Sequence, residues 1–324
     1  MSTNLSDLTS IEKANQDYIS GLELLQTSCI KCRCNPNYLD AIPYFKKAAD
    51  VYHGCGKFEK EVSTREKLVK CFNNEKSFWE EGNEYEKISK VQLNQLKAVE
   101  AAHISIINSF NAYASNHSYD DGIKALSKSS NEFIDAGERE EAKKILDFAF
   151  EGIDKYYQII TLNKQDSHNY IYECIDKYID LLFSKEEYKK SAEISQKASQ
   201  LVEREQKDEK RLICKYYGFQ AISELLNKKE ENYNNSVKKG MNYEVDYEVD
   251  DIKFCTKINK LVYVVRQKSE ENEGLIKKLF GEISRKVPSS IAKMMNIKFI
   301  QEHRATSNDT KEIRTDLSEE EDLK

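Results

Sequence analysis

Three stretches of the chain share one pattern of small and apolar residues, and they begin at Tyr38, Tyr119 and Tyr188. In each, a small residue follows the Tyr by three positions, and a second small residue comes seven positions after the first. The pairs are Ala41 and Ala48, Gly122 and Ser129, and Ser191 and Ala198. Seven residues are close to two helical turns, so both small residues lie on one stripe of a helix. The pattern therefore predicts helices that approach their neighbours closely.

The spacing of these copies favours a repeat architecture. A weaker copy begins at Phe78, so the four starting points are separated by 40, 41 and 69 residues. A repeat of about 40 residues that contains two helices is typical of a tetratricopeptide-like solenoid. Gly56 and Gly137 fit the turns between paired helices. The last interval has room for an inserted helix or helical pair.

We therefore expect an all-α fold, a tetratricopeptide-like solenoid of antiparallel helical hairpins. Segments 91–114 and 140–160 are interpreted as helices of such hairpins, and the polar segment 227–251 as a loop or connector. With 33% charged residues, only 3 Pro and 11 Gly, the composition also favours long amphipathic helices.

Charge and hydropathy exclude some classes of function. The net charge is -6, so no overall basic field attracts nucleic acid. No apolar run approaches the ~20 residues needed to span a bilayer, and the first residues lack the pattern of a signal peptide. The eight cysteines are then expected to stay reduced, and the protein to be cytoplasmic.

Motifs of catalysis are not found in the sequence. It contains no Gly-rich phosphate loop, no H-E-x-x-H and no G-x-S-x-G, and its five histidines are scattered. We expect no enzyme activity and no cofactor. One cluster offers an alternative, because Cys29, Cys32, Cys34, His53 and Cys55 could supply a zinc site. Cys-x-Cys is crowded for two ligands and free cysteine is a common core residue, so we favour packing or an exposed loop and predict no metal.

The last residues of the chain are strongly acidic. Residues 309–324 hold seven acids against three bases, a net charge of -4. Four consecutive acids, Glu319, Glu320, Glu321 and Asp322, precede Leu323. Such a tail is either a solvated end or a short peptide that a partner binds.

Together these features resemble the soluble attachment proteins that couple SNARE complexes to the N-ethylmaleimide-sensitive fusion ATPase, the SNAP family. Segments 21–61 and 181–205 are similar to the gamma type of that family, and the closing EEDLK is similar to the ending of the alpha type. The resemblance implies a right-handed solenoid over residues 1–209, a C-terminal helical bundle over 210–305 and an acidic tail over 306–324.

The resemblance also implies partners and contact residues. The solenoid would bind the SNARE complex (syntaxin-type helices) through basic residues that coincide with basic family positions, Lys57, Arg139 and Lys144. The tail residues Glu319, Glu320, Glu321, Asp322 and Leu323 would bind the fusion ATPase. Segment 112–118 departs from the family because it contains no Lys or Arg where the alpha type has a basic pair.

A loop before the first repeat would meet the membrane surface in this family. Here Ile30, Tyr38 and Leu39 are its apolar residues, and Lys31 and Arg33 could meet anionic lipid. The aromatic pair of the alpha type is missing, so we expect weak, peripheral membrane association.

Three functions follow as alternatives. The first is a non-enzymatic adaptor that recruits and stimulates the fusion ATPase for SNARE disassembly. The second is a tetratricopeptide-like scaffold for another partner, for instance an acidic peptide terminus. The third is an enzyme that uses the cysteine cluster or a metal.

Overall fold

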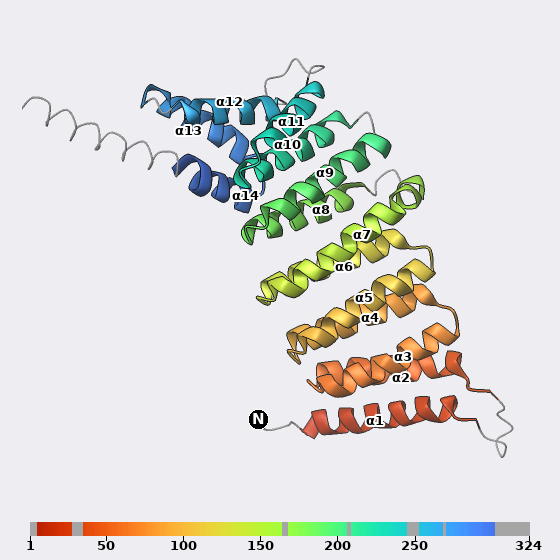
Figure 1. Ribbon diagram of the computed structural model, residues 1–324. Helices are drawn as coiled ribbons and strands as arrows, with labels where there is room; N and C mark the ends of the chain where they lie inside the picture. Colours follow the sequence, from red (N-terminus) through yellow and green to blue (C-terminus); the bar gives the residue numbers. More distant parts are fainter. Residues whose placement is uncertain are drawn as a thin grey trace, which may run out of the picture. The chain divides into compact units, whose positions relative to one another are not determined.

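The computed structural model describes residues 5–27, 35–163, 168–205, 209–244, 253–267 and 270–301. Over these ranges the chain forms helices joined by short turns and no strand, which confirms the predicted all-α helical repeat fold (Figure 1). The chain divides into two compact units, Met1–Cys174 and Ile175–Lys324, and the division falls inside one helix, α8.

Helices of similar length fill the first unit. They are α1 (Leu5–Leu25), α2 (Tyr38–Gly54), α3 (Phe58–Asn74), α4 (Phe78–Asn94), α5 (Val99–Ser115), α6 (Tyr119–Asp135), α7 (Arg139–Asn163) and the start of α8 (His168–Ser184). From α1 to α7 each helix packs against the next, and α4 also contacts α6 while α5 contacts α7. Contacts of this kind produce two layers of helices, the arrangement of a solenoid built from hairpins.

The small residues of the repeat are buried as predicted. Ala41, Ala48 and Ala198 have no exposed surface, and Ser191 has none either. A Cβ atom on Gly122 would lie 2.7 Å from the ring of Phe110, so α6 approaches α5 too closely for any side chain there. The stripe of small residues therefore sets the distance between helices.

The long repeat interval also has a simple explanation. One helix separates α2 from α4 and α4 from α6, whereas two helices, α7 and α8, separate α6 from α9 (Tyr188–Glu205). The interval of 69 residues thus contains one inserted helix.

Most turns between helices share one backbone geometry. Gly56 and Gly137 have positive φ, +66° and +89°, as a helix-ending glycine does. The same turn is made without glycine at Lys76, His117, Glu186 and Lys228, and a turn one residue longer has its positive φ at Lys97. At each turn, amide groups just past the helix donate to carbonyls of its last turn, for example Gly137 to Ile134 and Glu138 to Phe133.

This geometry corrects one prediction. Segment 91–114 is not a single helix, because α4 ends at Asn94 and α5 begins at Val99. Lys97 adopts a φ of 55° between them, and the Ala98 amide donates to the carbonyl of Gln92. Lysine seldom occupies a turn with positive φ, so the sequence gives no sign that the helical pattern is interrupted at this position.

The second unit is arranged around one central helix, α10 (Lys210–Leu226). It contacts α9, α11 (Glu230–Asn242), α12 (Phe254–Arg266) and the π-helical turn Met295–Gln301. The remaining elements are a short 3-10 turn (Glu270–Asn272), α13 (Glu273–Ser284) and α14 (Ser289–Met294), which follows Pro288. The predicted domain boundary at 209/210 lies between α9 and α10, two helices that pack along each other within this unit.

A second prediction is wrong in this unit. Segment 227–251 is not a connector throughout, because residues 230–242 form α11. Its buried residues Tyr233, Ser236, Val237 and Gly240 follow the i, i+3, i+4, i+7 spacing of one helical face. Only Val237 among them is a large aliphatic residue, so the sequence shows no apolar stripe here.

Candidate functional site

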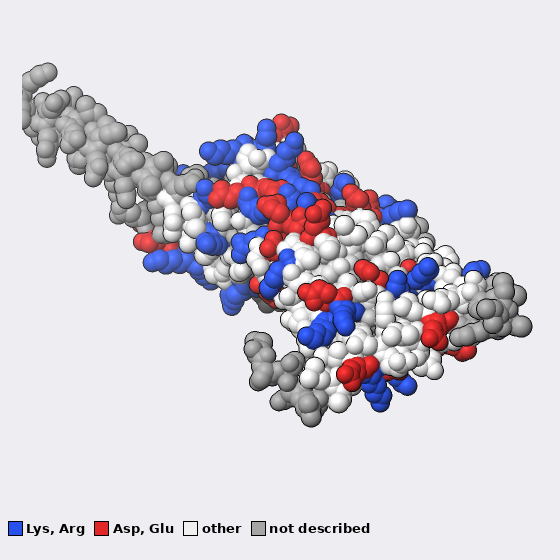
Figure 2. Space-filling view, turned by 90° about the horizontal axis from the view of Figure 1, so that it is seen from below, with Lys and Arg blue, Asp and Glu red and all other residues white. Residues whose placement is uncertain are grey.

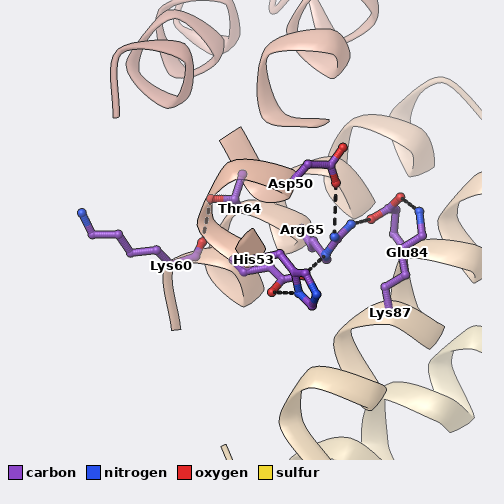
Figure 3. A network of polar contacts seen from close by, with 8 residues as sticks. Asp50, His53, Lys60, Thr64, Arg65, Glu84 and Lys87 are labelled. Carbon is purple, nitrogen blue, oxygen red and sulfur yellow. Dashed lines mark hydrogen bonds and ion pairs between the residues drawn. The ribbon is translucent and has the colours of Figure 1, made fainter. Parts of the chain in front are cut away.

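Arg65 on α3 occupies the centre of a buried ion network in the first unit (Figure 3). Its guanidinium donates from Nε to Glu61 Oε1 and from Nη1 to Glu84 Oε2, both at 2.8 Å, and from Nη2 to Asp50 Oδ1 at 3.5 Å. Three helices therefore meet at one side chain, since Asp50 lies on α2 and Glu84 on α4.

Burial gives this network its strength. Glu61 and Glu84 are 1% and 3% exposed, and Glu61 precedes Arg65 by four residues on the same helical face. Burial lowers the pKa of Arg65, but the hydrogen bond to Glu61 and the charge of Glu84 outweigh it and raise the pKa overall. Arg65 thus stays charged and fixes α3 to α4.

The network continues to the surface. His53 Nδ1 lies 2.8 Å from Glu61 Oε2, and Lys87 Nζ lies 2.7 Å from Glu84 Oε1. The side chains of His53 and Lys87 are about half exposed and line a cavity of about 450 Å³. The buried carboxylates thereby orient two of the groups that line this cavity.

Two further cavities, each of about 260 Å³, continue from the first one. The nearer cavity shares Lys87 and Lys90 with the cavity beside Arg65, and it shares Lys128 with the farther cavity. We call these three cavities the α4–α6 groove. Its lining residues on α4 and α6 are Trp79, Asn83, Glu86, Lys87, Lys90, Val91, Asn94, Asp121, Lys124, Ala125, Lys128, Ser129 and Glu132.

Four exposed lysines stand along the groove, two on each helix, and we call them the lysine row: Lys87, Lys90, Lys124 and Lys128. Lys87 pairs with Glu84, and Lys124 lies 3.5 Å from Asp120. Lys90 and Lys128 make no hydrogen bond or ion pair with any described residue. These two charges are available to a partner.

Most of the acidic side chains that line the groove accept a hydrogen bond from another side chain. Glu61 is bound to Arg65, Glu86 accepts a hydrogen bond from the Tyr113 hydroxyl at 2.6 Å, and Asp121 accepts one from Trp79 Nε1 at 3.2 Å. Acidic and basic side chains are interspersed over the surface seen in Figure 2. Glu86 and Asp121 keep their negative charge, because a hydroxyl and an indole N–H are neutral donors, and the side chain of Glu132 has no hydrogen bond or ion pair with any described residue. The groove therefore carries charges of both signs, with its lysines interspersed among acids.

One large aromatic side chain lies at an end of the groove. Trp79 is 42% exposed and packs edge-on against Tyr113, with ring centroids 6.3 Å apart. Its hydrogen bond to Asp121 joins α4 to α6. Tryptophan is enriched among the residues that contribute most to binding at protein interfaces.

The basic residues predicted from the sequence lie elsewhere. Lys57 follows the Gly56 turn and precedes α3, Arg139 is the first residue of α7, and all three predicted residues are exposed. Lys144 Nζ is 2.6 Å from Glu141 Oε1. None of the three lines the α4–α6 groove as described, so their role in binding stays a prediction.

Only two residues of the predicted membrane-contact loop can be placed. Tyr38 is half-buried and packs against a core cluster that includes Phe45, whereas Leu39 is 64% exposed. Ile30, Lys31 and Arg33 lie outside the described residues, as does the whole tail from Glu319 to Leu323. None of the described helices is both long and apolar enough to cross a membrane.

The N-terminal cysteine cluster is described only in part. Cys29, Cys32 and Cys34 lie outside the described residues. Cys55 is a free, partly exposed thiol at the end of α2, and His53 contacts Glu61. The alternative of a zinc site there is not tested.

Sequence reasoning missed the lysine row. Lys87 and Lys90 are three residues apart on one helix, and Lys124 and Lys128 are four apart on another, so each pair lies on one face. That spacing was visible, but the proximity of α4 and α6 depends on the packing of the helices between them.

Comparisons with known proteins give little further information. No protein-family model matches the sequence, and no curated protein matches it. Among solved structures, the chain is similar to BtubC (BKLC) from P. vanneervenii, with 10% identity over 76% of this chain and 95% of that one. The TM-score of 0.34 is too low for this similarity to support an inference about fold or function.

Proposed function

We propose that the protein is a non-enzymatic adaptor that binds the acidic surface of a SNARE-type helical bundle and recruits and stimulates the N-ethylmaleimide-sensitive fusion ATPase. The observation that carries the proposal is the lysine row, in which Lys90 and Lys128 stand exposed and unpaired among the described residues. The family resemblance of the sequence supplies the identity of the partners.

The arrangement suits a rigid, acidic, helical partner. Exposed lysines on two adjacent helices present charge along a surface, which steers an oppositely charged partner and fixes its register. Because these charges are solvated, binding should weaken steeply as ionic strength rises. The buried Arg65 network holds α3 and α4 in place beneath the surface.

One observation favours a second candidate, a scaffold for an acidic peptide terminus. The cavity beside Arg65 has a volume of about 450 Å³, in the range of sites that enclose small ligands, and Lys90 lines it. A single carboxylate chain end would fit that cavity, whereas a helical bundle would cover the groove as a whole.

Titration with two ligands separates these candidates. An assembled SNARE complex and an unstructured acidic peptide of matched net charge would be titrated into the protein at low and high salt. The adaptor function predicts preferential binding of the complex that is lost at high salt. Preferential binding of the peptide supports the scaffold, and binding of neither contradicts both.

The proposed role of the tail needs its own experiment. Deletion of residues 322–324 and the substitution Leu323→Ala should leave SNARE binding unchanged and reduce stimulation of the fusion ATPase. Unchanged stimulation would remove the functional assignment of the tail. Peripheral membrane contact is tested separately, because Ile30→Asp with Lys31→Glu should reduce liposome binding if the loop contributes.

A further inference from the structure

Two thiols and a carboxylate meet in the core of the second unit, far from the groove in sequence. Cys214 lies on α10, Glu244 follows the end of α11, and Cys255 lies on α12. They are 3%, 4% and 0% exposed, and their ligand atoms all lie within 4.8 Å of one another. Such a set is uncommon in a core, because carboxylates are rarely buried without a cationic partner.

The distances match the coordination of one metal ion. Two thiolates bound at about 2.3 Å to a tetrahedral zinc ion are about 3.8 Å apart, and a thiolate and a carboxylate oxygen on such an ion are about 3.5 Å apart. The sulfur atoms of Cys214 and Cys255 are 3.7 Å apart, and Cys214 Sγ is 3.2 Å from Glu244 Oε1. We propose that Cys214, Glu244 and Cys255 form a structural zinc site.

The surroundings of the ligands are already ordered. Glu244 accepts hydrogen bonds from the backbone amides of Cys255 and Thr256 and from the Thr256 hydroxyl, so its carboxylate is fixed at the start of α12. Contacts of this kind orient metal ligands in proteins. On α11, a Cβ at Gly240 would lie 2.3 Å from Cys255 Sγ, so only glycine leaves room for this thiol.

A bound cation would also change the protonation of the thiols. Both thiols lie in the core, and burial disfavours the charged thiolate over the neutral thiol. A coordinating metal reverses this preference, since it binds the thiolate. When zinc binds, the Cys214 and Cys255 thiols each release one proton to solvent, and the ion forms one bond to each sulfur and one to the Glu244 carboxylate.

Burial indicates a structural role for the ion. Three protein ligands leave the fourth position of the tetrahedron to a water molecule, but no ligand is exposed enough to admit a substrate. The ion would join α10, the end of α11 and the start of α12. Because residues 245–252 lie between Glu244 and α12 in the sequence, the ion would also hold the two ends of this segment together. The prediction of no metal site from the sequence concerned other cysteines.

The test uses the full chain with Cys29, Cys32 and Cys34 replaced by Ser, so that these residues bind no metal. After dialysis with a reductant against metal-free buffer, elemental analysis should find one zinc ion per chain. Replacement of zinc by Co²⁺ should give the thiolate-to-metal charge-transfer band of a site with two sulfur ligands. Cys255→Ser should lose the zinc, whereas Cys71→Ser, which removes another buried free thiol, should keep it.

Two variants guard against a simple loss of folding. Glu244→Gln retains an oxygen acceptor for the amides of α12, so it should fold and still bind zinc at least tenfold more weakly. Gly240→Ala leaves all three ligands present and should also weaken binding, because it displaces Cys255 Sγ. Less than a tenth of an equivalent of zinc with no cobalt–thiolate band would overturn the proposal, and so would undiminished zinc in Cys255→Ser.

Discussion

Arg65 on α3 and Glu84 on α4 form a 2.8 Å ion pair in which both side chains are less than a tenth exposed. Nineteen residues separate them in sequence, so the pair exists only when the two helices pack in register. Removal of Arg65 would leave the buried carboxylate of Glu84 with the half-exposed Lys87 as its remaining ion-pair partner, and that of Glu61 in contact with His53.

We therefore expect Arg65→Met to lower the free energy of unfolding of the first unit by about 3–5 kcal/mol. Lys87→Ala breaks an ion pair to the same Glu84 but removes a side chain that is 46% exposed, so it should cost less than about 1 kcal/mol. Urea unfolding followed by the fluorescence of Trp79, the one tryptophan of the chain, measures both. If the two variants lost the same free energy of unfolding, burial would not determine the strength of this network.

Gly218 tests the packing of α10 against α12. A Cβ there would lie 2.2 Å from the ring of Phe254, so we expect Gly218→Ala to destabilise the second unit by about 1–3 kcal/mol through overpacking. Gly281 on α13 is the matched control, because a Cβ there meets nothing within 4 Å. Gly281→Ala should stabilise by up to about 1 kcal/mol through helix propensity. Thermal unfolding of the two variants should shift in opposite directions.

Lys97 tests the turn that divides 91–114 into two helices. Its φ of 55° strains a residue with a Cβ, at a cost of roughly 1 kcal/mol. Lys97→Gly should therefore be neutral or stabilising, although glycine normally costs stability. Gly137→Ala, at a φ of +89°, should be destabilising in the same denaturation assay. A destabilised Lys97→Gly variant would argue against this turn.

Glu81 tests the pH dependence of the first unit. Burial raises its pKa and outweighs the hydrogen bond from Asn73, which lowers it. The folded state therefore keeps the Glu81 proton at pH values where the unfolded chain has released it, and the contribution of Glu81 to stability falls as pH rises above about 4.3. Glu81→Gln stays neutral, so its stability relative to the unmodified protein should be greater at about pH 8 than at about pH 4. A difference in stability that does not change with pH would contradict this assignment.

The helical repeat could be predicted from the sequence, because Ala41, Ala48 and their counterparts are small residues at helical spacing. That combination is explained only by helices that pack closely. The sequence was insufficient for turns such as Lys97, because a positive φ leaves no mark on a lysine. It was also insufficient for α11, where a buried face is made by residues as polar as Ser236.

The candidate sites could not be predicted from the sequence, because their residues come together only in the folded structure. Among 50 lysines and arginines, sequence cannot show that Lys90 and Lys128 form no ion pair with a described residue while Lys87 forms one. Likewise, Cys214 and Cys255 are 41 residues apart and meet only because α12 packs on α10.

The central claim is that the lysine row binds an acidic helical partner. Its most direct test is the affinity of Lys90→Glu with Lys128→Glu for an assembled SNARE complex at low salt. We predict a loss of about tenfold or more, equal to about 1.4 kcal/mol. Lys76→Glu with Lys97→Glu makes the same change of charge at two exposed turns outside the groove and should bind almost normally. The claim would be contradicted if the double variant Lys90→Glu with Lys128→Glu bound the complex with unchanged affinity. If the double variant Lys57→Glu with Lys144→Glu then lost affinity, the binding surface would be the one predicted from the sequence.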